Sequence, residues 1–146
     1  MLKPILIALA AGAVLPVQAL INGRLSAGLG SPLMAGNVSF LVAALALAAL
    51  QMALGHPLPS AQQAASVPLW IWLGGLLGVV YVVGAIVSVG AIGTTSAICL
   101  VIAGQIGAAL VVDRFGLLGA AGNPVSLLRL CGAGLVVVGA IVAVRG

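Results

Sequence analysis

The sequence predicts an all-α membrane protein, a small bundle of five transmembrane helices that assembles as an antiparallel dimer. Three observations lead to this prediction: the composition, the length of the apolar runs and the balance of basic residues between helix ends. Of the 146 residues, 64% are hydrophobic and only 4% are charged, whereas soluble domains carry about 25% charged residues. A surface of this composition faces lipid, which excludes a soluble enzyme and a disordered chain.

Five apolar stretches are long enough to cross a bilayer. A helix rises 1.5 Å per residue, so about 20 residues cross the roughly 30 Å hydrocarbon layer. The run from residue 67 to residue 112 would be about 69 Å long as one helix, so we expect it to turn at 91–93, between two glycines. The predicted spans, forming one transmembrane domain of residues 1–146, are about 4–23, 32–54, 67–90, 94–112 and 124–144.

Local signals mark the ends of these spans. A capping side chain and a proline predict three helix starts, at Ser31-Pro32, at Ser66 with Pro68, and at Asn123-Pro124. Hydroxyl groups at 94–96 are expected to cap the fourth helix. The predicted loops are 24–31, 55–66, 91–93 and 113–123, with Gly55 and Gly116 following two helix ends.

The start of the chain has an alternative interpretation. Lys3, the apolar run 5–14 and Val17-Gln18-Ala19 together imitate a secretory signal peptide with its cleavage site. Four further spans follow, so we expect this segment to remain as the first helix.

Basic residues are almost evenly divided between the two membrane sides. Lys3, Arg114 and Arg129 fall on the side of the N-terminus, and Arg24 and Arg145 on the other. Because the side richer in Lys and Arg stays cytoplasmic, three against two barely selects an orientation. With an odd number of spans, an inverted pair requires copies in both orientations. Dual topology and one fixed orientation both remain open.

Uncharged polar side chains gather toward one end of the predicted bundle. Gln18 and Asn22 are four residues apart and so share one face of the first helix, and Gln105 lies near the middle of the fourth span. Polar groups in lipid need partners, so this arrangement predicts a polar vestibule that binds a solute. The candidate binding residues are Gln18, Asn22, Asn37, Ser39, Tyr81 and Gln105. The alternative is that the amides only hydrogen-bond neighbouring helices.

Two further features bear on movement and coupling. Pro16 cannot donate to the carbonyl of Gly12, which predicts a kink or hinge in the first helix at these two residues. Asp113 is the only acidic residue. It is expected to pair with its neighbour Arg114 at a helix end, or else to couple transport to an ion or proton.

No constellation for catalysis is present in the sequence. It offers no nucleophile beside a base, no carboxylate pair and no metal-ligand cluster, so we expect neither an enzyme nor a bound cofactor or metal. Cys99 and Cys131 lie inside apolar runs as small buried side chains. The scattered basic residues form no patch for nucleic acid.

Several motifs carry a family resemblance over nearly the whole chain. They are the run 12–25 with its Pro16-x-Gln18-x-x-x-Asn22 pattern, the segment 30–35, Ala103-Gly104-Gln105, the segment 113–117 and Ser126-Leu127-Leu128-Arg129. Together they resemble the YdcZ-type five-helix family of the drug/metabolite transporter superfamily. Members occur as single dual-topology proteins, as oppositely oriented pairs or as fused ten-helix chains.

The resemblance implies a half-size transporter but supplies no substrate. Our first hypothesis is a secondary transporter of a small organic solute in a bacterial-type inner membrane. It would work as an inverted homodimer with alternating access. Two alternatives remain open: a small dual-topology anion channel that uses the same polar side chains, and a non-transporting partner subunit of another membrane protein.

Overall fold

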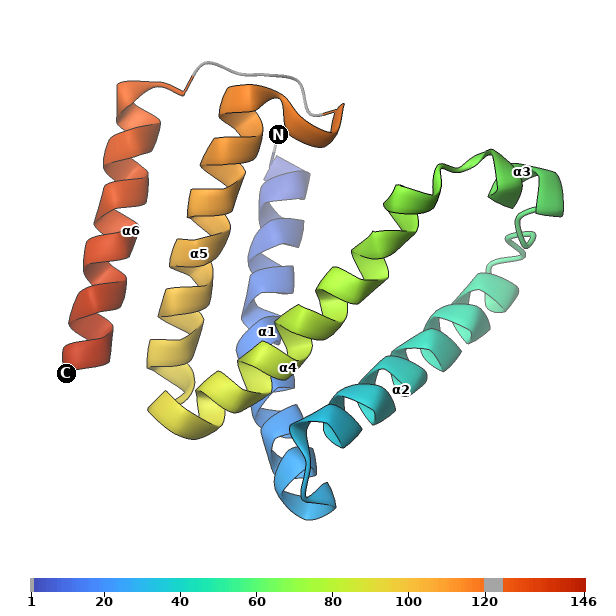
Figure 1. Cartoon of the computed structure of the whole chain (residues 1–146), viewed down its shortest axis with the longest axis horizontal. Coiled ribbons are helices and arrows are strands. Elements are labelled where there is room, and N and C mark those ends of the chain that lie inside the picture. Colours follow the sequence, from blue (N-terminus) through green and yellow to red (C-terminus); the bar gives the residue numbers. More distant parts are fainter. Residues whose placement is uncertain (1, 120–124) are drawn as a thin grey trace. The chain divides into compact units, whose positions relative to one another are not determined.

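The computed structural model describes residues 2–119 and 125–146, and its regular structure within these ranges is entirely helical (Figure 1). The elements are α1 (Leu2–Leu29), α2 (Pro32–Ala53), α3 (Ala61–Ser66), the 3-10 helix η1 (Leu69–Leu73), α4 (Gly74–Ile92), α5 (Thr94–Phe115), the 3-10 turn η2 (Leu117–Gly119) and α6 (Leu127–Arg145).

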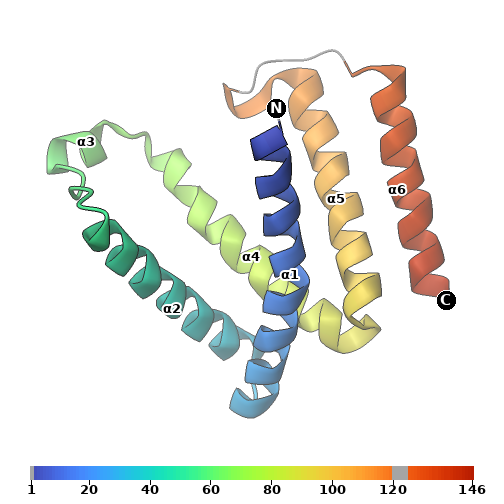
Figure 2. The same cartoon turned by 180° about the vertical axis from the view of Figure 1, so that it is seen from behind.

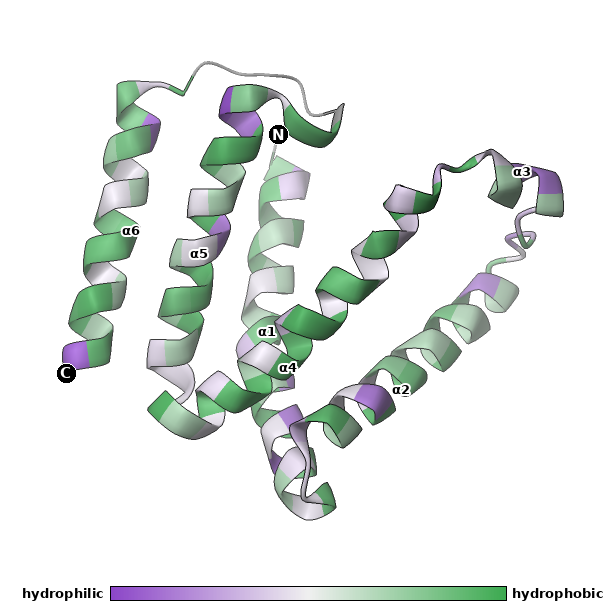
Figure 3. Ribbon diagram, viewed as in Figure 1, coloured by the Kyte–Doolittle hydropathy of each residue, from purple (hydrophilic) through white to green (hydrophobic). Residues whose placement is uncertain are grey.

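Within the described ranges, five segments are long and apolar enough to cross a membrane, which confirms the predicted all-α membrane fold. They are Leu2–Leu29, Pro32–Ala53, Leu69–Ile92, Thr94–Phe115 and Leu127–Arg145. The third combines η1 with α4. The hydropathy colouring in Figure 3 shows apolar residues over most of each of the five, as lipid-facing helices require.

The chain divides into two compact units, Met1–Val87 and Ser88–Gly146. In the first unit α1 packs against α2, and α3 lies in the connection between α2 and α4. In the second unit α5 and α6 lie side by side in both views (Figures 1 and 2). The expectation that residues 1–146 act as a single domain stays a prediction.

The turn between α1 and α2 is shorter than predicted. The loop expected at 24–31 is wrong, because α1 continues to Leu29 and only Gly30 and Ser31 separate the two helices. No proline interrupts residues 24–29, so helical hydrogen bonding persists until Gly30 adopts a left-handed φ of 72°. Arg24 therefore lies inside α1.

Ser31 and Pro32 start α2 as predicted. The Ser31 hydroxyl oxygen accepts a hydrogen bond from the backbone N–H of Met34 at 3.4 Å, and Pro32 occupies the first turn, where its missing N–H costs nothing. Gly116 ends α5 in a left-handed conformation with φ 59°, and Gly55 follows α2 with φ 67°, both as the sequence indicates.

Two predicted caps are wrong. Ser66 ends α3 and donates its hydroxyl to the Gln63 carbonyl at 2.7 Å, so it starts no helix. The α3 helix itself, capped by Ser60 and Gln63, was not predicted. Between α4 and α5 the turn is the single residue Gly93, whose φ of 79° reverses the chain without a side-chain cap, and the hydroxyls at 94–96 lie inside α5.

The predicted start at Asn123-Pro124 lies outside the described residues. Beyond them, α6 begins at Leu127, and the Ser126 hydroxyl accepts a hydrogen bond from the backbone N–H of Arg129 at 3.3 Å. A serine thus caps this span, three residues after the predicted position.

Small residues mediate the packing of the first unit. The buried side chains include Ala19 on α1, Ala35 on α2 and Ala85 on α4. A Cβ added at Gly36 would lie 3.4 Å from Val83 Cγ2, and one at Gly78 would lie 3.5 Å from Phe40 Cζ. These close approaches bring α2 and α4 together along their Gly36 and Gly78 faces.

The α5–α6 hairpin also packs through small residues, and one side-chain hydrogen bond joins the two helices. Ala97 is 1% exposed and Ala140 is 3% exposed, which lets the two backbones approach. Ser96 then donates its hydroxyl to the Ala143 carbonyl of α6 at 3.1 Å. The bond links the beginning of α5 to the end of α6.

We predict that Ser96→Ala lowers the free energy of unfolding by about 0.6 kcal/mol, the average for side-chain hydrogen bonds between membrane helices. Unfolding in mixed micelles measures it. Thr95→Val is the matched control, since it removes a hydroxyl from an exposed neighbour on the same helix. Equal effects of the two substitutions would show that the Ser96 bond contributes nothing specific.

Candidate functional site

Asn22 is the most unusual polar residue of the described chain. It is 6% exposed and is the single buried polar or charged residue among residues 2–119 and 125–146. Ala19 beside it on α1 is also buried, so this face of the helix packs against the protein. Gln18, one turn earlier, shares the face but is exposed.

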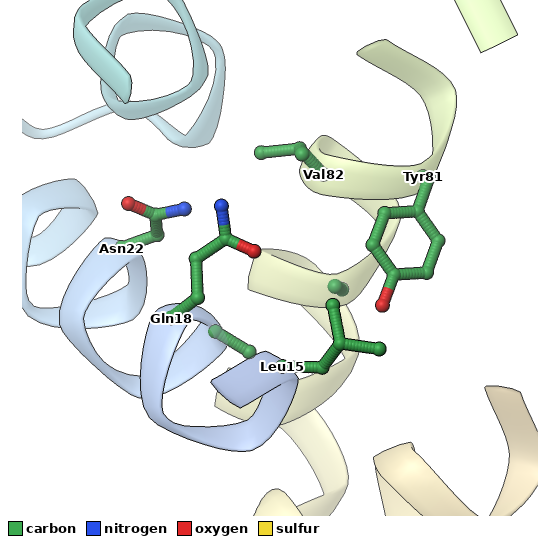
Figure 4. A pocket seen from close by; sticks show the side chains of 7 residues that line it. Leu15, Gln18, Asn22, Tyr81 and Val82 are labelled. Atoms are coloured by element: carbon green, nitrogen blue, oxygen red, sulfur yellow. The ribbon is translucent and has the colours of Figure 1, made fainter. Parts of the chain in front are cut away.

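A small cavity lies between α1 and α4 beside Asn22. Figure 4 shows the amides of Gln18 and Asn22 next to each other on α1, with the ring of Tyr81 across the space on α4. The cavity measures about 10 Å³, close to the roughly 10–15 Å³ that one water molecule needs. Its lining residues are Leu15, Gln18, Ala19, Asn22, Tyr81, Val82 and Ala85.

A larger groove lies on the other side of the same two amides, between α1 and α2. Its volume is about 360 Å³, within the range of small-molecule sites. Apart from Gln18, Asn22 and Ser39, its walls are aliphatic. The lining residues are Val14, Val17, Gln18, Ile21, Asn22, Leu25, Val38, Ser39 and Val42.

The Asn22 amide has no protein partner within the described part of the chain. No side-chain hydrogen bond involves it, although bonds as long as 3.4 Å are present elsewhere. In the same ranges no fully enclosed side-chain polar atom lacks a partner, so the amide is in contact with open space. A buried amide that meets only cavities is available to a ligand.

The structure brings together four of the predicted binding residues. Gln18, Asn22 and Tyr81 line the small cavity, while Gln18, Asn22 and Ser39 line the groove. Asn37 is exposed on α2 and lines neither space. Gln105 is exposed on α5 in the second unit. For all of these residues, a role in binding stays a prediction.

The predicted hinge residues both lie within α1. Pro16 is half-buried, and α1 remains helical on both sides of it. Gly12 faces open space, with nothing within 4 Å of a Cβ added there. A hinge at these positions stays a prediction.

The predicted pairing of Asp113 with Arg114 is wrong. The Asp113 carboxylate instead faces the Arg129 guanidinium of α6 at 3.7 Å. Adjacent residues on a helix point about 100° apart and cannot face each other, whereas the start of α6 lies beside the end of α5. Arg114 lines a separate cavity of about 500 Å³ with Leu110, Val111, Phe115, Val125 and Leu130.

Sequence reasoning missed the small and aliphatic walls of the site. Ala19 of α1 and Ala85 of α4 line the small cavity together with Leu15 and Val82. The available signal was Ala19 one turn before Asn22 on the same face. Within the described ranges, no group of three or more His, Cys, Asp or Glu side chains comes together.

Comparison with known families identifies the family of this chain. The family model described as "Putative inner membrane exporter, YdcZ" matches residues 3–142. The chain belongs to the YdcZ family. Searches of curated proteins and of solved structures gave no match.

YdcZ family membership and the five apolar spans define the cellular setting. The protein is a multi-pass inner membrane protein of an exporter family. It lies in the lipid bilayer, and its membership of an exporter family suggests a small-molecule solute. Both cavities at Asn22 lie between spanning helices, which is where transporter sites occur.

We predict that Asn22→Leu keeps or raises the free energy of unfolding, by at most about 1–3 kcal/mol. The substitution removes no hydrogen bond and relieves the desolvation of a buried amide. Chemical unfolding in micelles measures it, with the exposed Gln62→Leu on α3 as the control. A drop of about 0.6 kcal/mol or more would mean that the amide serves as an interhelical bond.

Proposed function

We propose that this YdcZ protein is a half-size secondary transporter of a small organic solute, which works by alternating access as an inverted homodimer. The observation that carries the proposal is the buried Asn22 amide, which has no hydrogen-bond partner among the residues that the structure describes and lines two cavities between spanning helices. Family membership supports export as the direction of transport.

The inverted homodimer is supported by topology and charge. Five spans put the two ends of the chain on opposite membrane sides, so a two-fold axis in the membrane plane requires one copy to insert upside down. Lys3, Arg114 and Arg129 oppose Arg24 and Arg145. This near-balance permits both orientations.

The deciding experiment is counterflow in proteoliposomes. A solute screen by thermal stabilisation first finds a ligand, because binding to the folded state raises the apparent midpoint of unfolding. A carrier then exchanges labelled for unlabelled ligand across the membrane. An uncoupled current without exchange would indicate a channel, and a chain that forms no stable homodimer and moves no solute would indicate a partner subunit.

We predict that Gln62→Lys with Ala65→Lys fixes one orientation and abolishes exchange. Both positions are exposed on α3 and lie outside its capping box, and two added lysines on this side outweigh the opposing pair. Labelling of single cysteines at residues 2 and 146 in a cysteine-free background measures orientation.

Matched controls separate topology from damage. Glutamates at the same two positions should leave orientation mixed, since acidic residues contribute little. Co-expression with Ala27→Lys, Gly28→Lys, which adds charge at the opposite end of α1, should restore exchange. Full activity in a population with a single orientation would overturn the inverted dimer.

The Asp113–Arg129 pair bears on coupling. Its side chains are 42% and 54% exposed, and pairs this exposed contribute about 0–1 kcal/mol. Because the Asp113 carboxylate pairs with an arginine of the neighbouring helix, it can serve to hold α5 against α6. This pairing favours a structural role for Asp113 over proton transfer.

We predict that Asp113→Asn and Arg129→Gln have the same small effects. Each breaks the pair, and each should lower the free energy of unfolding by at most about 1 kcal/mol while exchange and its pH dependence persist. Only Asp113→Asn removes the carboxylate. Loss of exchange in Asp113→Asn alone would assign Asp113 to coupling.

A further inference from the structure

The two cavities at Asn22 differ in size and in lining. The space between α1 and α4 has about 10 Å³ and is bordered by two amides and the Tyr81 side chain. The groove between α1 and α2 has about 360 Å³ and mainly aliphatic walls. Gln18 and Asn22 line both spaces, so these two amides are shared by a small compartment, where Tyr81 adds a third polar side chain among aliphatic ones, and a large compartment with mainly aliphatic walls.

Neither compartment contains a charged side chain. Their lining residues include no Asp, Glu, Lys, Arg or His. The charged residue nearest to Asn22 in the sequence is Arg24, two positions on and therefore on another face of α1. Moving an ionised group out of water without a counter-charge is unfavourable, so we expect the site to disfavour ions.

The small compartment limits the polar end of a ligand to about the size of a water molecule. Carboxamides both donate and accept hydrogen bonds, and the tyrosine hydroxyl does the same. A hydroxyl group has the size and the hydrogen-bonding capacity to fit there. The remainder of such a ligand would extend past Asn22 into the aliphatic groove.

We infer that the solute of this site is an uncharged amphiphile whose hydroxyl end meets Asn22 and Gln18 and whose apolar body lies in the α1–α2 groove. That this ligand is transported rests on the proposed function, whereas its binding at Asn22 does not. It names a ligand class by polarity and shape: a neutral alcohol with an apolar body small enough for the groove.

The chain offers a site-specific probe for this inference, because Tyr81 is its single tyrosine. Labelling with 3-fluorotyrosine gives one fluorine resonance, located at the small cavity. The protein is placed in phosphatidylcholine nanodiscs and titrated with benzyl alcohol, toluene, benzylammonium and benzoate. These probes share one ring and differ in the end group, and they are compared at equal concentrations in the bilayer.

Benzyl alcohol should shift the Tyr81 resonance saturably, at concentrations about tenfold below those that toluene needs. Neither ion should shift it in that range. Asn22→Leu should remove the advantage of the alcohol over toluene, while Gln62→Leu preserves it. Gln18→Leu, which changes the exposed one of the two shared amides, should reduce the advantage and keeps the test independent of how Asn22→Leu folds.

Four results would overturn the inference: an ion that binds as tightly as the alcohol, no saturable shift with any probe, an alcohol advantage that persists in Asn22→Leu, or equal responses to toluene and alcohol. Equal responses would mean that the groove accepts any apolar molecule, a lipid acyl chain included. Counterflow separates the two proposals. Alcohol-selective binding without solute exchange would overturn the transporter alone, and exchange of an ionic solute through the Asn22 site would overturn the ligand class alone.

Discussion

Close contact between helices through alanine and glycine is the interaction on which the rest of this structure depends. Helices in lipid gain nothing from burying apolar side chains, because lipid is equally apolar. Packing therefore comes from backbones that approach closely, and among residues 2–119 and 125–146 five of the six buried hydrophobic residues are alanines. The buried Ala19 of α1 and Ala85 of α4 both line the small cavity beside Asn22.

The close packing of α1 buries Asn22, and this burial bears on function. An amide in a membrane is costly unless it finds a partner. In the described part of this chain the Asn22 side chain is buried, yet no residue hydrogen-bonds its amide, although Gln18 and Tyr81 line the same cavity. Burying the Asn22 amide without a hydrogen bond lowers the stability of the fold. This cost is consistent with a binding site, because functional sites commonly keep polar groups that the fold itself does not satisfy.

Charge pairing contributes less to the stability of this chain than helix packing does. Asp113 and Arg129 join the end of α5 to the start of α6, where both side chains are exposed. The Ser96 bond to Ala143 joins the other ends of the same two helices. Polar contacts thus join α5 and α6 at both ends of the hairpin, with the buried alanines Ala97 and Ala140 between them. None of these contacts involves the amides of α1.

The sequence by itself determined the five spans and several of their ends. Span length follows from bilayer thickness, and the Ser31 cap and the turn glycines Gly55, Gly93 and Gly116 act through local backbone geometry. Only the tertiary structure decided that Asn22 is buried while Gln18 is exposed, and that Asp113 faces Arg129. The physical reason is that every face of a membrane helix is apolar, so hydrophobic periodicity, which identifies the packed face in soluble proteins, carries little information here.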